Sequence, residues 1–349
     1  MISRRVLLTL PLVLGCRRGE RAQSTPAPSS LSWAPPPRIT PVSSTPEAAP
    51  AAPGASSGPA SSTADAAPGA SSDPTRPRRA RAAPLLDAEG RPTKLPTIAL
   101  VPEPRTPSER FPALIALHGL GEARKGPERG AWGWVRDYAL DVAFARLAAG
   151  DLRSEDFHGF VTPSRLTALR DDLARRPFAG LAVLCAYTPD LLQRPSLDNA
   201  KELGRRLFDE VLPAARATLP ILAAPHATGI DGVSLGGRAA LLVGLAHPRE
   251  LAAVGALQAA IQLPEAEPLA ARAAIAIAAQ PSLRLRLVTS KRDFYRAEIA
   301  ALDAALTRRD VPHRHEVLPG PHDYPWNQGP GALEMLLYHD RVLRGMDAI

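Results

Sequence analysis

The sequence predicts an α/β fold, in which a doubly wound, mainly parallel sheet follows a disordered tether rich in Ala, Pro and Ser. Three observations support this prediction. From about residue 84 onward, short apolar runs alternate with amphipathic segments of helical length. Residues 23–84 contain almost no aromatic or branched apolar side chains. Polar, Gly-containing segments follow several apolar runs directly, as is typical of the carboxyl ends of strands in such sheets.

The N-terminus has the features of an export signal. Arg4 and Arg5 precede an apolar run over 6–14, which is too short to span a bilayer as a helix. The run ends in Val-Leu-Gly-Cys, which resembles the lipobox of bacterial lipoproteins, so residues 1–16 are predicted to be a signal peptide with Cys16 as the lipid-carrying residue. We expect export to the bacterial cell envelope and membrane attachment through this N-terminal lipid anchor. An ordinary cleaved signal with an incidental cysteine is the alternative.

Residues 17–83 are predicted to be a linker. Ala-Pro-Gly-Ala-Ser-Ser occurs at 52–57 and again at 67–72, and such a composition cannot offset the entropy cost of ordering. The remaining residues, 84–349, suit one sizeable α/β domain.

The net charge of +7 does not predict nucleic-acid binding. Arg4 and Arg5 carry two of the charges and residues 17–83 carry a net four, which leaves about one for the predicted domain. With Cys16 acylated, Cys185 would be the one cysteine left, so no intramolecular disulfide is expected. Its place inside an apolar run predicts an inert core thiol.

Within the predicted domain, strands and helices alternate in order. Continuous apolar runs predict strands that are covered on both faces, and alternation predicts a strand nearer the sheet edge. The predicted strands are 97–101, 111–117, 179–186, 227–230, 251–257, 283–289 and 313–318, and the predicted helices are 135–149, 164–175, 197–212, 238–246, 294–309 and 331–343.

A candidate nucleophile lies in Gly232-Val233-Ser234-Leu235-Gly236-Gly237. This G-x-S-x-G pattern follows a short extended segment and precedes a helical one, which is the context of a nucleophile elbow. A tight strand-to-helix turn strains the serine, and side chains at Gly232 or Gly236 would collide with the neighbouring chain. Ser234 is therefore expected to stand exposed at the start of a helix. A Gly-rich turn without chemistry is the alternative.

Two partners for Ser234 follow at later strand ends. A serine hydroxyl needs a base, and the base needs a third group that fixes its tautomer. Asp293 directly follows the predicted strand 283–289 and His322 lies in a Gly/Pro loop after 313–318, in the order serine, acid, histidine. We expect Ser234, Asp293 and His322 to be a catalytic triad. The alternatives are a helix N-cap for Asp293, which is compatible with the triad role, and a turn residue for His322.

The strand over 111–117 delivers His118-Gly119-Leu120-Gly121 at its end. Backbone amides of such a loop can hold an oxyanion, together with the amide after the nucleophile. We expect the donors to be Leu120 and Leu235, with Gly119 as the alternate to Leu120. His118 is a candidate substrate contact, for which ordering of the loop is the alternative.

Aromatic residues near these strand ends are candidates for the wall of a substrate pocket. Aromatics make up 5% of the chain, so their recurrence near the predicted site is informative. The candidates are Trp132, Trp134, Tyr187 and Trp326. Core packing explains the two neighbouring tryptophans equally well.

From Phe111 to the C-terminus, the chain resembles the α/β-hydrolase superfamily, in particular the esterase branch with esterase D and enterochelin-esterase-like proteins. The residues that carry the resemblance are His118 to Gly121, Gly232 to Ala240 with His247-Pro248, Thr289 to Asp293, and Leu318 to Trp326. It implies the α/β-hydrolase fold and ester hydrolysis by Ser234, with His322 as base, Asp293 as its orienter, and neither metal nor cofactor. The long stretch 121–179 departs from the family pattern, at the place where a lid or acyl pocket would lie.

The sequence thus predicts a lipid-anchored envelope serine hydrolase. It would act on small-molecule carboxylic esters through an acyl-enzyme. A peptidase or thioesterase with the same triad is one alternative. A non-catalytic envelope binding protein on the same fold is the other.

Overall fold

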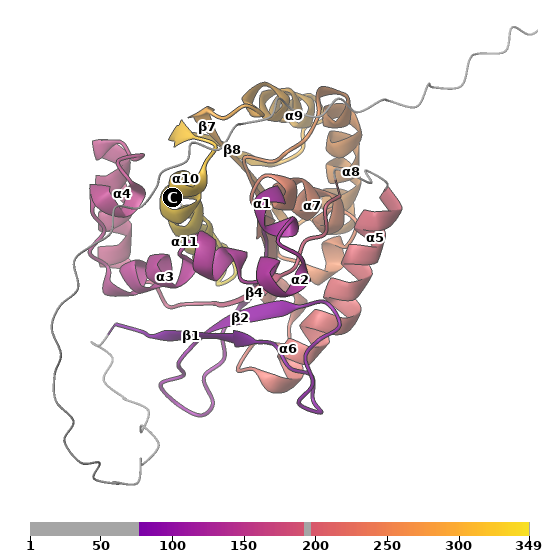
Figure 1. Ribbon diagram of the computed structural model, residues 1–349. Helices are drawn as coiled ribbons and strands as arrows, with labels where there is room; N and C mark the ends of the chain where they lie inside the picture. The colour runs from indigo at the N-terminus through magenta and orange to yellow at the C-terminus, as the bar shows by residue number, and fades with distance from the viewer. Residues whose placement is uncertain (1–76, 192–196, 349) are drawn as a thin grey trace, which may run out of the picture. The chain divides into compact units, whose positions relative to one another are not determined.

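The computed structural model describes residues 77–191 and 197–348. The predicted signal peptide, Cys16 and the linker as far as residue 76 lie outside the described residues. Eight strands form one sheet in the order β1-β2-β4-β3-β5-β6-β7-β8 (Figure 1). Strands β3 to β8 run parallel to one another, whereas β1 and β2 are antiparallel to their neighbours. This arrangement confirms the predicted mainly parallel α/β fold.

The described strands are β1 Ala80–Pro84, β2 Thr97–Pro102, β3 Ala113–Leu117, β4 Ala182–Ala186, β5 Thr228–Gly232, β6 Ala253–Leu257, β7 Arg284–Arg292 and β8 Arg314–Pro321. The α-helices are α1 Leu120–Ala123, α2 Pro127–Gly130, α3 Leu140–Ala149, α4 Pro163–Arg175, α5 Leu197–Arg206, α6 Leu212–Thr218, α7 Leu235–Gly244, α8 Ala266–Ala279, α9 Arg296–Arg308, α10 Tyr324–Trp326 and α11 Ala332–Val342. Every residue of β3, β4, β5 and β6 is buried, as expected for central strands that are covered on both faces.

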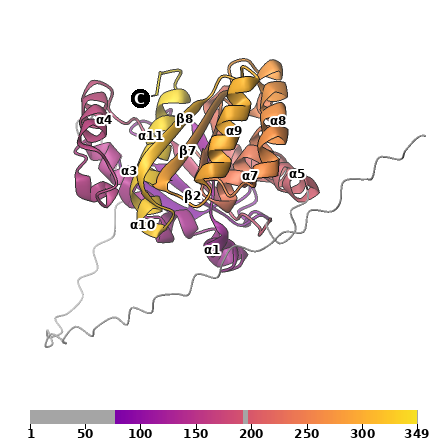
Figure 2. The ribbon, with the colours of Figure 1, turned by 90° about the horizontal axis from the view of Figure 1, so that it is seen from above.

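Helices cover both faces of the sheet. Helices α3, α4 and α11 lie on one face, and α5, α7, α8 and α9 lie on the other (Figures 1 and 2). Because the parallel strands all point the same way, the segments that follow them meet at one edge of the sheet. This carboxyl edge collects Ser234, Asp293 and His322 from three separate crossovers.

Strand β1 corrects the predicted linker boundary. Residues 80–84 pair antiparallel with β2, although the sequence analysis assigned residues up to 83 to the linker. The side chain of Arg78 is also anchored, since it donates two hydrogen bonds to the Glu109 carboxylate, at 2.7 and 3.0 Å. An edge strand pairs on one side only and needs no apolar run. The composition of this segment therefore did not reveal it.

The stretch 121–179, which departs from the family pattern, folds as part of the helical layer. It contributes α3 and α4, and both pack near α11. Ion pairs with α11 fix α4: Arg165, which is partly exposed, donates to the Glu334 carboxylate at 2.6 Å, and the buried Arg341 donates to the buried Asp172 at 2.9 Å. This stretch is thus joined to the last helix of the chain.

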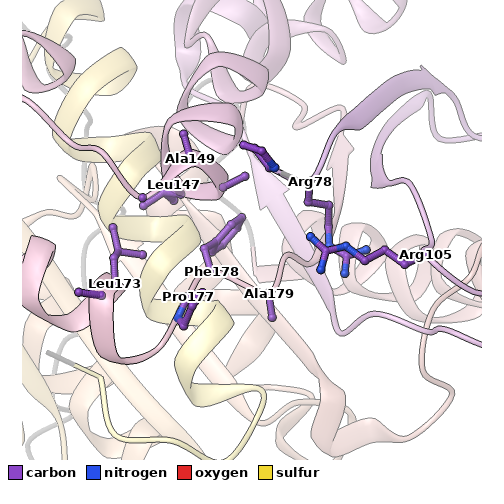
Figure 3. Close-up of a pocket in the computed structure, with 12 residues that line it drawn as sticks. Arg78, Arg105, Leu147, Ala149, Leu173, Pro177, Phe178 and Ala179 are labelled. Atoms are coloured by element: carbon purple, nitrogen blue, oxygen red, sulfur yellow. The ribbon is translucent and has the colours of Figure 1, made fainter. Parts of the chain in front are cut away.

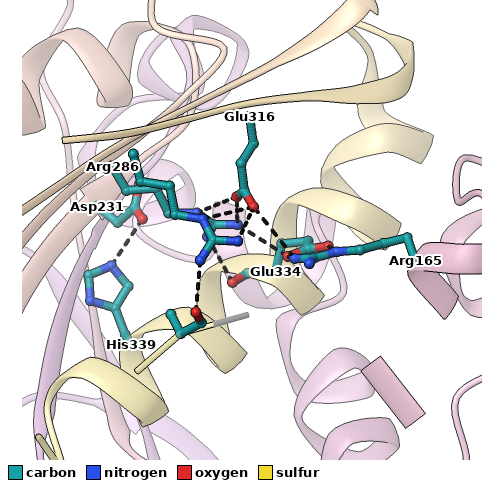
Figure 4. Close-up of polar contacts among 8 residues, drawn as sticks. Arg165, Asp231, Arg286, Glu316, Glu334 and His339 are labelled. Atoms are coloured by element: carbon teal, nitrogen blue, oxygen red, sulfur yellow. Dashed lines mark hydrogen bonds and ion pairs between the residues drawn. The ribbon is translucent and has the colours of Figure 1, made fainter. Parts of the chain in front are cut away.

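A buried ionic cluster ties the same layer to the sheet (Figure 4). Arg286 of β7 is 1% exposed and donates to Glu316 of β8 at 2.5 Å and to Glu334 at 3.1 Å. Beside it, His339 of α11 lies 3.0 Å from the Asp231 carboxylate of β5, with both side chains fully buried. The described fold therefore contains several buried charges outside the carboxyl edge.

Candidate active site

Ser234 occupies the strand-to-helix turn between β5 and α7. Its backbone angles, φ 58° and ψ −117°, lie in a region that a residue with a side chain rarely adopts. The surrounding backbone holds this conformation: the Ser234 amide donates to the Leu257 carbonyl at 2.9 Å, and the Ser234 carbonyl accepts from the Ala260 amide at 2.9 Å. The end of β6 thus fixes the serine in the strained turn that a nucleophile elbow requires.

The glycines of the motif are needed for close backbone approach, as predicted. A Cβ on Gly236 would lie 2.1 Å from the Leu117 carbonyl oxygen and 2.7 Å from that of His118. A Cβ on Gly232 would lie 2.5 Å from the Gly236 carbonyl. Both clashes are with backbone, which cannot rotate away as a side chain can. The glycines therefore allow the elbow to pack against the end of β3.

The Ser234 side chain is only partly buried, and its hydroxyl makes no hydrogen bond within the described part of the chain. The loop after β3 passes beside it, since a Cβ placed on Gly119 would lie 3.8 Å from Ser234 Cβ. The elbow therefore presents a free hydroxyl next to the loop that is expected to bind an oxyanion.

The candidate oxyanion donors differ in how they are engaged. The Gly119 amide donates to Tyr138 Oη at 3.2 Å. The amides of Leu120 and Leu235 are the first of their helices, and neither has an acceptor among the residues described. The geometry favours Leu120 over the alternate Gly119, with Leu235 as the second donor.

Asp293 and His322 are brought together by the ends of β7 and β8. His322 Nδ1 lies 2.8 Å from Asp293 Oδ1, and since a carboxylate can only accept, Nδ1 carries the proton. Asp293 is 6% exposed and also accepts from the Thr289 hydroxyl at 2.6 Å and the Tyr295 amide at 3.0 Å. The Phe294 ring stacks on the imidazole with centroids 4.2 Å apart. His322 Nε2 is therefore left with a lone pair, as a base requires.

No hydrogen bond joins Ser234 to His322 directly among the described residues, but a buried glutamine, Gln258, braces the strand end before His322. Gln258 follows β6, is fully buried, and has a positive φ of 45°. Its Nε2 donates to the Ser290 hydroxyl at 2.7 Å and to the Pro321 carbonyl at 2.8 Å, one residue before His322. Gln258 was not among the site residues predicted from the sequence. Its position directly after a buried strand, the signal that identified Asp293, could have revealed it.

His118 is not available as a substrate contact. It is 1% exposed; the Thr188 amide donates to its Nε2 at 2.9 Å, so Nδ1 carries the proton and donates to the Gly119 carbonyl at 3.0 Å. Burial lowers the pKa of His118 to about 4, which keeps the ring neutral. The structure supports the alternative reading, in which His118 orders the loop after β3.

The predicted aromatic wall is only partly present. Trp134 and Trp326 are fully buried core residues, and the Trp326 indole donates to the Pro319 carbonyl at 3.1 Å. The prediction that they line a substrate pocket was wrong. The position of an aromatic residue in the sequence does not show whether its side chain points towards the site or into the core. Trp132 and Tyr187 are partly exposed; the Arg136 guanidinium lies 4.1 Å from the Trp132 ring centroid, and Tyr187 donates to the Ala123 carbonyl at 3.0 Å.

Two cavities of the described chain are lined by residues other than Ser234. One of about 660 Å³ is lined by Arg78, Leu147 and Phe178, among others, at the amino end of β4 and hence at the opposite edge of the sheet (Figure 3). The other, of about 590 Å³, lies beyond the carboxyl end of β4 and includes Tyr187 and Asp190. Neither contains a residue of the predicted triad.

Residues 77–191 and 197–348 contain no group of three or more His, Cys, Asp or Glu side chains that could hold a metal ion. In the same residues, no helix has the length and apolarity needed to cross a bilayer. Cys185 is buried, and burial raises the pKa of its thiol, which fits the expected inert core thiol.

No protein-family model matches the chain, and no curated protein matches it in sequence. Solved structures match its fold. An S-formylglutathione hydrolase from Staphylococcus aureus has a TM-score of 0.51 at 16% identity, over 76% of this chain and 98% of that one. A ferulic acid esterase reaches 0.54 at 14% identity, over 76% and 99%. The fluorophosphonate-binding serine hydrolase F of Staphylococcus aureus reaches 0.50 at 14% identity, over 76% and 99%. The described chain has the α/β-hydrolase fold of these enzymes.

Proposed function

We propose that this chain is a serine hydrolase that cleaves carboxylic esters of small molecules. The observation that carries the proposal is the Asp293–His322 hydrogen bond at the carboxyl edge from which the strained elbow presents Ser234. The likeness in fold to structures described as esterases and serine hydrolases supports it. It requires no metal and no cofactor.

The chemistry follows from the positions of the side chains. Ser234 Oγ attacks the ester carbonyl while His322 Nε2 takes the hydroxyl proton. Asp293 keeps the proton on Nδ1 and stabilises the imidazolium that forms. The amides of Leu120 and Leu235 donate to the oxyanion of the tetrahedral intermediate. His322 then protonates the leaving alcohol. A water molecule, deprotonated by His322, attacks the acyl-enzyme, and His322 returns this proton to Ser234 Oγ as the acid is released.

A substrate panel tests the proposal. Purified protein is assayed on p-nitrophenyl acetate, a feruloyl ester, an acyl thioester and a peptide anilide, each with Ser234→Ala as control. We expect ester turnover that Ser234→Ala abolishes. Preference for the thioester or the anilide would favour the thioesterase or peptidase alternative. Absence of turnover on all four by folded protein would favour a non-catalytic binding protein.

The lipid anchor is proposed from the sequence alone. The apolar run that ends at Cys16 supports attachment to a membrane of the cell envelope, with residues 17–76 between the anchor and the described domain. Feeding cells an alkyne-labelled fatty acid should label the wild-type protein and not a Cys16→Ala variant. Equal labelling of both, or of neither, would contradict the anchor.

A further inference from the structure

A buried carboxylate lies between the loop after β3, which carries the proposed oxyanion donor Leu120, and the loop after β8, which carries His322. Glu122 is on α1, two residues after Leu120, and is 1% exposed. Its two oxygens accept from different tyrosines: Tyr138 Oη donates to Oε2, and Tyr324 Oη donates to Oε1 at 2.7 Å. The Lys125 ammonium, at 3.7 Å from Oε1, is the nearest countercharge. Removing a carboxylate from water is costly, so both of its oxygens are expected to need such partners.

The Tyr138 contact fixes the oxyanion loop. Burial raises the pKa of Tyr138 well above its usual value, so the hydroxyl keeps its proton and donates it to Glu122. The same oxygen is then free to accept from the Gly119 amide, at 3.2 Å. This acceptor fixes the direction of the His118–Gly119 peptide, one peptide before the amide of Leu120. The Leu120 amide has no acceptor among the described residues and is left for the oxyanion.

The Tyr324 contact reaches the loop that carries the base. Tyr324 begins α10, two residues after His322, and Asp323 caps that helix by accepting from the Trp326 amide at 3.0 Å. Burial raises the pKa of the Tyr324 hydroxyl, and its hydrogen bond to Glu122 acts in the same direction, so it too remains a donor. One carboxylate therefore holds the backbone on both sides of the proposed active site.

The packing around Tyr324 depends on a missing side chain. A Cβ on Gly121 would lie 2.6 Å from Tyr324 Oη and 3.7 Å from Tyr324 Cζ, and these are its nearest atoms outside the neighbouring chain of its own helix. The space at Gly121 is thus filled by the hydroxyl that reaches Glu122. The hydrogen bond between Tyr324 and Glu122 can therefore be removed by a substitution at Tyr324 or by one at Gly121.

We propose that Glu122 is a positioning residue, which fixes the distance between the oxyanion donor Leu120 and the base His322 through Tyr138 and Tyr324. The inference rests on the proposed hydrolase function. A misplacement of about 1 Å costs on the order of 100-fold in rate, so a residue that joins two catalytic loops acts on kcat without touching the substrate.

The test removes the cross-loop hydrogen bond and keeps the ring. Tyr324→Phe should lower kcat for p-nitrophenyl acetate about tenfold with little change in KM, and should slow fluorophosphonate labelling of Ser234 by a similar factor. Tyr338→Phe, which removes a hydroxyl from the core side of α11, is the matched control and should match the wild type in both. Thermal denaturation of each variant verifies folding. A loss of stability alone would lower the active fraction without slowing the labelling of the protein that remains folded.

Gly121→Ala provides an independent test from the other loop. In the wild type, the new Cβ displaces the Tyr324 hydroxyl, so kcat should again fall about tenfold. In the Tyr324→Phe background, the nearest ring atom would be at ordinary contact distance, so the same substitution should have no added effect.

The outcomes distinguish failure of the positioning role of Glu122 from failure of the proposed hydrolase function. Two outcomes would overturn the positioning role and leave the hydrolase proposal intact. In the first, the wild type is active and Tyr324→Phe has the same kcat and labelling rate. In the second, Gly121→Ala lowers kcat equally in the wild-type and Tyr324→Phe backgrounds. Wild-type protein that is neither active nor labelled would overturn both.

Discussion

At the scale of single residues, neighbouring groups fix the backbone conformation, the tautomer or the charge of each residue in the proposed active site. Ser234 is fixed in its strained conformation by two backbone hydrogen bonds to the end of β6. Asp293 accepts three hydrogen bonds, of which the one from His322 sets the tautomer of the imidazole. His118 is held neutral by burial at the entrance of the oxyanion loop. Such preorganisation reduces the rearrangement needed when a substrate arrives.

Substitution of Asp293 tests the tautomer argument. Asp293→Asn should lower kcat by about 10⁴, because the amide no longer holds the proton on Nδ1, while the fold persists. The matched control is Asp303→Asn, since Asp303 also lies 2.8 Å from a histidine, His313, at a place remote from Ser234. Initial rates of ester hydrolysis measure both variants. Equal rates for Asp293→Asn and the wild type would exclude Asp293 from the triad.

His118 predicts a pH dependence of stability. Its folded pKa of about 4 lies below the ordinary value of 6.5, so between these values the unfolded chain binds more protons than the folded one. The stabilisation from neutral His118 is complete above about pH 6.5 and is lost as the pH falls towards about 4; the loss amounts to roughly 3 kcal/mol.

The measurement compares urea denaturation of the wild type and His118→Gln at pH 7 and pH 4. The difference in unfolding free energy between the two proteins should change by roughly 3 kcal/mol over this interval, since glutamine does not titrate. A constant difference would show that His118 titrates normally in the folded protein.

At the scale of elements, each strand end contributes one function. In the proposed mechanism, the end of β3 supplies the oxyanion loop, β5 the nucleophile, β7 the acid and β8 the base. The end of β6 supplies Gln258, which links β7 to the end of β8. Behind these strands, β7, β8, α4 and α11 are joined by the buried cluster around Arg286. The elements that carry Asp293 and His322 therefore share one ionic cluster at a distance from the site.

Breaking this cluster should affect stability. Arg286→Met should lower the unfolding free energy by about 3 kcal/mol, because it removes the one fully buried cation of the pairs with Glu316 and Glu334 and leaves these carboxylates only the partly exposed Arg314 and Arg165. The matched control is Arg308→Met, whose pair with Glu267 is exposed and should contribute almost nothing. Chemical denaturation measures both. Equal effects would mean that the buried cluster is no more important than a surface pair.

At the scale of the described chain, the alternation of strands and helices could be predicted from the sequence, since fully buried strands need continuous apolar runs. The candidate site was predictable as far as it lies at strand ends in a fixed order, which identified Ser234, Asp293 and His322. The strand β1 was not, because its residues are mostly exposed and pair on one side only.

Side-chain direction was the other limit. Trp134 and Trp326 lie close in sequence to the predicted site yet point into the core, and His118 points towards Thr188. Glu122, Tyr138 and Tyr324 are far apart in sequence, and no local pattern shows that one carboxylate accepts from both tyrosines. Such contacts depend on tertiary packing, which local periodicity does not encode.

The central claim is that Ser234 is a nucleophile activated by His322. The most direct measurement is mass spectrometry of the folded protein after reaction with a fluorophosphonate probe, with Ser234→Ala and His322→Ala in parallel. We expect one covalent adduct, on the peptide that contains Ser234, absent in Ser234→Ala and formed far more slowly in His322→Ala. Folded wild-type protein without an adduct on Ser234, or labelled equally fast without His322, would contradict the account.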